Sequence, residues 1–160
     1  MSMELKLWPA LLLASLLLLP VFTPAALAAV RITGFTDFTF GTWSGSGDLV
    51  LYDGSLCVYD SGGGQYKITI TGSGSGGAYT IASGANTLAY TVGFKASSGT
   101  GGTFTAMTSG TRKNFTPPNT ASETCGGVYN AALRLTFAAA SLSAAAPGSY
   151  SGSVTVLLEP

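Results

Sequence analysis

The chain has 160 residues, of which only 9% are charged, and its formal net charge is zero. It contains no histidine, and Arg112-Lys113 is its only adjacent basic pair. Nucleic-acid binding relies on clustered Lys and Arg that displace counterions from phosphates, so this composition argues against a nucleic-acid-binding protein. Few charges together with many apolar residues also argue against a disordered chain.

The first element in chain order is an apolar, leucine-rich run over residues 7–19, which follows Lys6 and ends at Pro20. A membrane anchor is one interpretation of this run. Spanning a bilayer takes about 20 consecutive apolar residues, and this run is shorter and is followed by prolines. A signal peptide with a short apolar core is therefore the better interpretation.

The predicted cleavage site follows this run. Ala26 and Ala28 place small residues at the first and third positions of an Ala-Leu-Ala tripeptide, which suits signal peptidase. We predict a cleaved signal peptide over residues 1–28, with cleavage after Ala29 as the alternative. The mature chain, residues 29–160, has the length of one domain. We expect the chain to contact a membrane only through this signal, during export.

Alternation of apolar and polar residues dominates the mature chain, which is typical of strands with one buried face. The clearest alternating segments are residues 66–70, 88–94, 133–137 and 150–158, and the shorter candidates are residues 32–40, 49–52, 56–59, 78–81 and 103–107. Glycine-rich turns separate them, which predicts an all-β sandwich or barrel. The alanine runs at 138–140 and 144–146 predict a helical turn that ends at Pro147-Gly148.

Cys57 and Cys125 are the only cysteines. In an exported chain an even count argues for a disulfide between them. A metal pair and free thiols are the alternatives, but two cysteines without histidine or a nearby acidic cluster make a poor metal site. Because the loop between them is long, the chain-entropy model gives such a bridge about 4 kcal/mol of stabilisation.

We find no arrangement of residues that indicates catalysis. Asp48 and Asp53 could form a carboxylate pair for glycoside hydrolysis, but both flank turns, where Asp commonly bonds its own backbone. No histidine is present to activate a serine. Asn114 begins an N-glycosylation pattern, which matters only in hosts with that machinery. We therefore expect a protein that is not an enzyme, with no catalytic, cofactor-binding or metal-binding residues.

Aromatic residues near turns and strand ends offer a different kind of site. These residues are Trp43, Tyr52, Tyr59 and Tyr129. Exposed together, they would form a platform for sugars, although aromatic side chains more often serve as packing material.

Several short motifs occur in an order that resembles the spore coat protein U domain family, the pilin-like subunits of archaic chaperone–usher pili. The motifs are Phe38-Thr39-Phe40-Gly41, Leu56-Cys57-Val58-Tyr59, the segment 66–72, Leu88-Ala89-Tyr90, Cys125-Gly126-Gly127 and the closing segment 148–156. The resemblance covers most of the mature chain, and the first and last motifs are its most specific parts.

This resemblance implies an immunoglobulin-like β-sandwich that lacks its final strand. In that family a periplasmic chaperone lends a strand to the subunit, an outer-membrane usher assembles the fibre, and a neighbouring pilin subunit later replaces the chaperone strand. The last predicted strand would then be an open edge, although an ordinary sandwich whose last strand is an edge agrees with the sequence equally well. Its core-facing residues, which we assign to an assembly edge, are Tyr150, Val154, Val156 and Leu158.

We therefore predict a non-enzymatic structural subunit of a pilus or coat, exported to the periplasm and then to the cell surface. A self-contained secreted module that binds glycans or surfaces is the alternative. The segment 29–37 also leaves two possibilities open, because it is short for a donor strand. Either the subunit accepts a strand without giving one, or this segment is simply part of the first strand.

Overall fold

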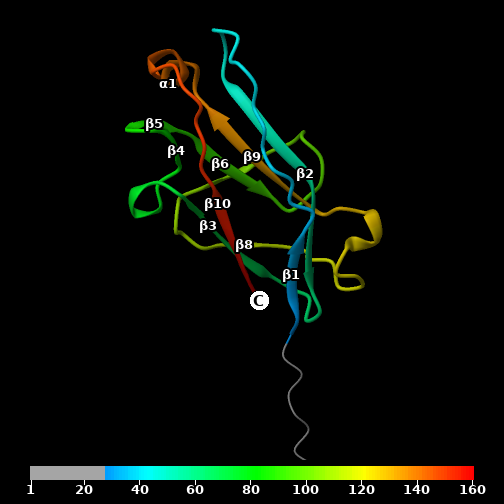
Figure 1. Cartoon of the computed structure of the whole chain (residues 1–160). Helices are drawn as coiled ribbons and strands as arrows, with labels where there is room; N and C mark the ends of the chain where they lie inside the picture. The colour runs from blue at the N-terminus through cyan, green and yellow to red at the C-terminus, as the bar shows by residue number, and fades with distance from the viewer. Residues whose placement is uncertain (1–27) are drawn as a thin grey trace, which may run out of the picture.

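The structure of the protein is a computed structural model that describes residues 28–160 (Figure 1). The strands are β1 (Val30–Thr33), β2 (Leu49–Asp60), β3 (Tyr66–Gly72), β4 (Thr80–Ser83), β5 (Asn86–Ala89), β6 (Thr91–Lys95), β7 (Thr105–Met107), β8 (Lys113–Phe115), β9 (Ala131–Phe137) and β10 (Val154–Glu159). The helical elements are the 3₁₀ turns η1 (Ser75–Gly77) and η2 (Cys125–Gly127) and the short helix α1 (Ala139–Ala144). The predicted signal peptide lies almost wholly outside the described residues. Within them, no helix is long and apolar enough to cross a membrane.

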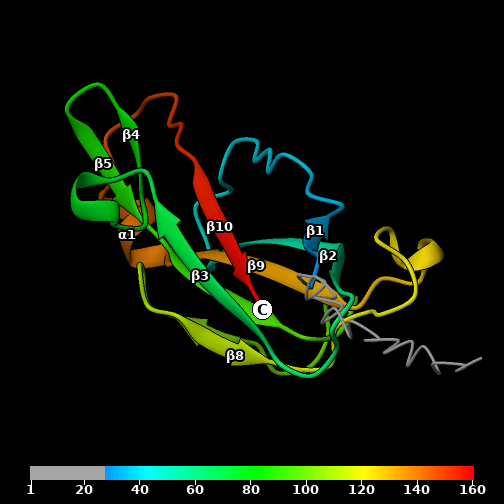
Figure 2. The same ribbon diagram turned by 90° about the horizontal axis from the view of Figure 1, so that it is seen from below.

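Antiparallel strands form two facing layers, so the predicted all-β sandwich is confirmed. One layer is a five-stranded sheet in the order β1-β2-β9-β6-β7, and the other is a three-stranded sheet in the order β10-β3-β8. A small ribbon of β4 and β5 adjoins them. Seen from below, β3 and β10 cross above β9 of the larger sheet (Figure 2).

The core lies between the two sheets and follows the predicted alternation. In β3 the side chains of Tyr66, Ile68 and Ile70 are fully buried, whereas the residues between them are partly exposed. In β9 the same alternation buries Leu133 and Phe137. Each strand therefore contributes every second residue to a common apolar core.

The segment predicted as a single strand over residues 88–94 is two strands in two sheets. β5 pairs with β4, and β6 pairs with β9. The chain changes sheets at Tyr90, whose N–H donates to the carbonyl of Tyr79 at 2.9 Å. The alternation continues through this change of sheet, because Leu88 in β5 and Val92 and Phe94 in β6 are all buried.

Strand boundaries near the N-terminus also differ from the sequence prediction. The first strand covers residues 30–33 instead of 32–40, because the chain turns at Gly34 with a φ of 90°. A Cβ at Gly34 would lie 2.2 Å from the carbonyl oxygen of Ser55. The two strands predicted over residues 49–59 are one long strand, β2, whose pairing with β9 shifts between Asp53 and Leu56.

The other differences between the predicted and the observed elements lie in the C-terminal half of the chain. The closing strand begins at Val154, and the preceding segment makes only a bridge between Ser151 and Ala82. The short strand β8 had no strong sequence pattern and was not predicted. The predicted helical turn is present as α1.

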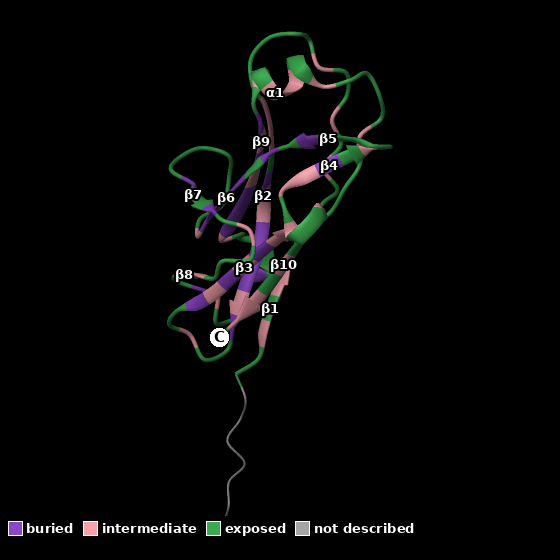
Figure 3. Ribbon diagram, turned by 90° about the vertical axis from the view of Figure 1, so that its left-hand side faces the viewer, coloured by how far each residue is buried: buried purple, intermediate pink, exposed green. Residues whose placement is uncertain are grey.

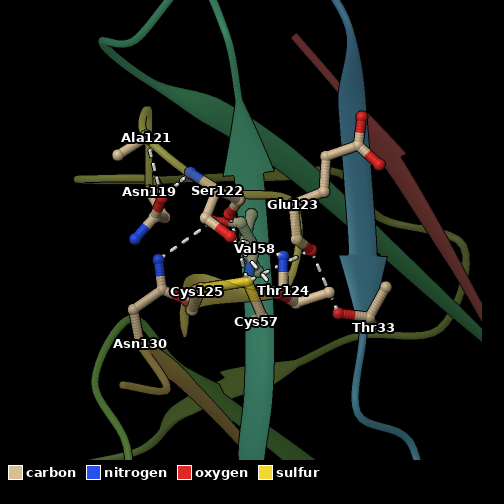
Figure 4. The surroundings of a disulfide bond; sticks show 10 residues. All are labelled: Thr33, Cys57, Val58, Asn119, Ala121, Ser122, Glu123, Thr124, Cys125 and Asn130. Carbon is tan, nitrogen blue, oxygen red and sulfur yellow. Dashed lines mark hydrogen bonds between the residues drawn. A yellow bond between two sulfur atoms is a disulfide. The ribbon is translucent and has the colours of Figure 1, made fainter. Parts of the chain in front are cut away.

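The predicted disulfide between Cys57 and Cys125 is confirmed (Figure 4). It joins β2 to the turn η2, across 68 residues of sequence. Beside it, the side chain of Asn130 continues the sheet. Its Oδ1 accepts from the Val58 N–H at 2.8 Å, and its Nδ2 donates to the Val58 carbonyl at 2.9 Å. The loop before β9 is thus fixed to β2 by a covalent bond and by an amide that replaces a strand partner.

We predict that Asn130→Ala lowers the free energy of unfolding by about 2 kcal/mol, because the Val58 N–H loses this acceptor. The Val58 carbonyl still accepts from the N–H of Asn119 at 2.8 Å. Urea unfolding of the chain over residues 29–160 measures the loss. Asn114→Ala is the control, since Asn114 is exposed and its amide reaches only Gln65 Oε1 at 3.4 Å. Equal losses in the two variants would contradict this role of Asn130.

Candidate functional site

A groove opens along β10. On the side of β10 opposite to β3 runs the segment 34–48, which connects β1 to β2 and which we call the strap (Figures 1 and 2). The groove between β10 and the strap has a volume of about 410 Å³. Strap residues form one wall, the segment 150–156 forms the other, and core residues form the floor.

β10 has a strand partner on one side only. It pairs with β3 from Val154 to Glu159, and it is the end strand of its sheet. No residue of β10 is fully buried, although its neighbour β3 contributes several fully buried side chains to the core (Figure 3). The edge of β10 that faces the groove therefore presents backbone groups that no strand of the described chain pairs.

The four residues that we assigned to an assembly edge lie along this side of the molecule. Tyr150, Val154 and Val156 line the groove, and Leu158 continues the same face of β10 beyond it. All four are half-buried and pack against the core. Their neighbour Leu157 points the other way and is 54% exposed. Their part in assembly stays a prediction.

The floor of the groove is the apolar core itself. Leu133, Leu135 and Phe137 of β9 reach it from the opposite sheet, together with Ile81 and Tyr90. These floor residues are themselves buried. The apolar surface that stays in contact with water belongs to the walls of the groove, where Phe35 is 44% exposed and Val154 and Val156 are half-buried.

Aromatic rings close one end of the groove. Phe40 of the strap packs on Phe137 with ring centroids 5.4 Å apart, and Tyr90 packs on Phe137 at 5.2 Å. Tyr79 lies 5.6 Å from Tyr90 and donates its hydroxyl to the carbonyl of Ile70. Burial raises the pKa of Tyr79 to about 12, and burial also raises the pKa of Tyr90. Both phenols are therefore neutral at physiological pH.

The groove carries almost no charge. Asp37 is the single charged residue among those that line it, and Thr36, Ser151 and Ser153 are its uncharged polar ones. An extended segment with uncharged, apolar side chains fits this lining better than a charged ligand does.

Asp53 holds the strap in place. Its carboxylate is 2% exposed and accepts four hydrogen bonds. Oδ2 accepts from the N–H of Thr36 at 2.8 Å and from its hydroxyl at 3.1 Å. Oδ1 accepts from the N–H and hydroxyl of Ser55, at the irregularity in β2. Asp53 thus fixes the groove wall to the large sheet.

The other sequence candidates do not form a common site. Asp53 accepts from the nearby N–H of Ser55, as the turn interpretation expects, whereas Asp48 accepts from the distant N–H of Ala139 at 2.9 Å. The two carboxylates thus have separate backbone partners. The four aromatic residues also lie apart: Trp43 in the strap, Tyr52 and Tyr59 on β2, and Tyr129 after η2. Among residues 28–160 no group of three or more His, Cys, Asp or Glu side chains could hold a metal ion.

Sequence reasoning missed the strap as a groove wall. Phe38 and Phe40 were assigned to the first strand, but Gly34 ends that strand before them. The signal that could have found the wall was present in the sequence. Phe35, Phe38 and Phe40 do not share one face of a strand, so a single buried strand could not hold all three.

Comparison with known proteins supports the fold. No family model matches the chain, and no curated protein matches it significantly. A chain from a solved chaperone–tip adhesin complex of CFA/I fimbriae biogenesis has a similar fold, with a TM-score of 0.52 and 15% identical residues. The match covers 82% of the present chain and 42% of that chain. The present chain therefore spans less than half the length of its structural neighbour.

We predict that Asp53→Asn lowers the free energy of unfolding by about 2 kcal/mol, because the new NH₂ group of the buried side chain would face the N–H of either Thr36 or Ser55, donor against donor. Urea unfolding measures this loss, and hydrogen exchange at Thr36 should speed up as the strap loosens. Asp48→Asn is the matched control, because Asp48 is exposed and accepts a single bond. A slow, unchanged Thr36 amide in Asp53→Asn would show that Asp53 does not hold the strap.

Proposed function

We propose that this protein is a non-enzymatic structural subunit of a surface fibre, and that its groove accepts a β-strand from a partner protein. The observation that carries the proposal is the combination of an unpaired edge on β10 with an apolar groove that reaches the core. An enzyme needs converging acid, base or nucleophilic groups, whereas this groove offers apolar side chains and free backbone groups.

An incoming strand could both pair with the open edge of β10 and fill the apolar groove. Its backbone can pair with the open edge of β10, and every second side chain can enter the space above Leu133 and Leu135. Burial of each Val-sized or Leu-sized side chain contributes about 1.5–3 kcal/mol. A strand with three or four such residues would therefore stabilise the sandwich substantially.

The partners that we propose are a periplasmic chaperone, an outer-membrane usher and neighbouring pilin subunits. The structural neighbour belongs to a complex of a chaperone with a fimbrial tip adhesin, which supports a partner of the first kind. The usher follows only from the resemblance to the spore coat protein U domain family. The predicted signal peptide and the disulfide between Cys57 and Cys125 support export to the periplasm and then to the cell surface.

The N-terminal residues bear on the place of the subunit in a fibre. Val30–Thr33 form β1 and pair with residues 57–60 of β2, so they are used within the domain. If the signal peptide is cleaved after Ala28, these residues are not free to enter a neighbour. We therefore propose that the segment is part of the first strand and that the subunit accepts a strand without donating this one.

The groove is expected to select an alternating strand. The test uses a synthetic peptide of about nine residues that alternates valine and threonine, to match the length of the segment 150–158. We expect it to bind the exported chain and raise its melting temperature. A peptide of the same composition with its valines clustered at one end should bind much more weakly, because it cannot fill one face of the groove.

Variants on the two faces of β10 locate the binding site. Val156→Ser removes about 1.5 kcal/mol of apolar contact, which corresponds to about tenfold weaker peptide binding. Leu157→Ser, one residue away on the exposed face, should bind like the wild type. Equal effects of the two variants would contradict binding in the groove. The proposal also fails if the lone chain is soluble, monomeric and unaffected by either peptide or by a chaperone.

A further inference from the structure

The outer face of the five-stranded sheet carries a second, separate cluster of side chains. Phe104 lies against this face directly over Gly93 of β6, where a Cβ would come within 2.9 Å of the Phe104 Cβ. Arg134, Lys95 and Tyr52 surround the Phe104 ring. Because Leu133 and Leu135 point into the core, Arg134 between them points away from the groove.

Arg134 is held in place but has no acidic partner. Its guanidinium carbon lies 4.7 Å from the centre of the Phe104 ring, and its buried Nε has no hydrogen-bond acceptor. Within residues 28–160 no carboxylate forms an ion pair with it, whereas Arg31 pairs with Glu123 and Arg112 with Glu159. Stacking on an aromatic ring orients a planar guanidinium and leaves its outer N–H groups available to a ligand.

Lys95 places a second positive charge on the same ring. Its ammonium lies 5.0 Å from the centre of the Phe104 ring and donates to the carbonyl of Gly101. The residue is 7% exposed, so the glycine-rich loop before Phe104 covers it. Lys95 therefore adds to the positive potential around Arg134 while its own side chain is almost wholly buried.

No acidic side chain offsets these charges on the neighbouring outward positions. The strand register places these positions in three rows: Val50, Thr136 and Thr91; Tyr52, Arg134, Gly93 and Ala106; Ala132 and Lys95. Asp48 lies at the edge of this face, where it lines a hollow with Thr91 and Thr136 and accepts from the N–H of Ala139. In a chain with so few charges, the two cations beside Phe104 still form a distinct positive site.

Tyr52 gives the site an exposed flat surface. It lies opposite Arg134 in the pairing of β2 with β9, its ring is 5.9 Å from that of Phe104, and it is 40% exposed. A ring of this kind next to a guanidinium matches a ligand that has an apolar face and a carboxylate. A carboxylated sugar has both features.

We propose that this face binds an acidic saccharide. The carboxylate of the sugar accepts two parallel hydrogen bonds from the guanidinium of Arg134, and the apolar face of the sugar ring packs on Tyr52. Lys95 strengthens the attraction through its charge. The site lies on the opposite face of β9 from the groove, so the protein can bind a saccharide and a partner strand at the same time.

The test compares oligomers of glucuronic acid with neutral glucose oligomers of the same length, using isothermal titration of the exported chain. We expect the acidic oligomer to bind at least about tenfold more tightly, as charge-assisted bidentate hydrogen bonds require. Its affinity should fall as salt is added, because the site is solvent-exposed. Equal binding of the two oligomers, or binding of neither, would overturn the proposal.

Four variants assign the effect to individual residues. Arg134→Gln should abolish the preference for the acidic oligomer, and Arg134→Lys should keep only part of it because the bidentate geometry is lost. Arg112→Gln is the matched control and should bind like the wild type. Should Arg134→Gln fail to fold, Tyr52→Ser tests the same site from an exposed position and should weaken binding. Unchanged binding in Tyr52→Ser and in a folded Arg134 variant would refute the site, whatever the outcome for the groove.

Discussion

The organisation of this protein depends on one unmet requirement, the pairing of the outer edge of β10. A strand inside a sheet satisfies its backbone donors and acceptors on both sides, and a sandwich covers both inner faces of its sheets. β10 has β3 on one side and an open groove on the other. Beside this open edge the walls of the groove leave apolar side chains partly exposed, Phe35 on the strap and Val154 and Val156 on β10. Backbone pairing and apolar burial are thus incomplete at one place, and a single added strand would complete both.

The structure around the groove keeps this open edge in a defined shape. Asp53 fixes the strap by bonds to Thr36, and the disulfide with Asn130 fixes the loop before β9 to β2. Both sets of interactions attach a connecting segment to the long strand β2. A groove with fixed walls can accept a strand without first ordering the domain, which lowers the entropy cost of association. The few charges on the surface also leave little electrostatic repulsion between neighbouring copies or partners.

The sequence predicted which face of each alternating strand is buried, but it said much less about which strands pair with one another. Alternation correctly identified the buried face of β3, because every second residue there is apolar and the strand stays in one sheet. It did not reveal that the chain changes sheets at Tyr90, since both strands continue the same alternation. Local pattern reports which side of a strand is apolar, whereas the choice of neighbouring strand depends on contacts far apart in the sequence. The disulfide between Cys57 and Cys125 was predictable because the sequence offers only these two cysteines and a signal-peptide pattern that predicts export.

The groove could be predicted only in part for the same reason. The wall formed by Val154 and Val156 follows from the alternation of the last strand. The opposite wall depends on the turn at Gly34, where a close approach to the Ser55 carbonyl ends β1 and releases the strap. The positive cluster around Phe104 was not predictable either, because it requires the register that sets Arg134 beside Gly93.

Hydrogen exchange along β10 tests the central claim most directly. The chain over residues 29–160 is compared alone and with a bound strand, and the exchange of each amide from Val154 to Glu159 is followed. An open edge predicts that alternate amides, those that do not face β3, exchange rapidly in the lone chain. The same amides should become protected when a strand occupies the groove. Uniform protection of all these amides in the lone chain would contradict the account, because it would mean that the edge of β10 is already paired.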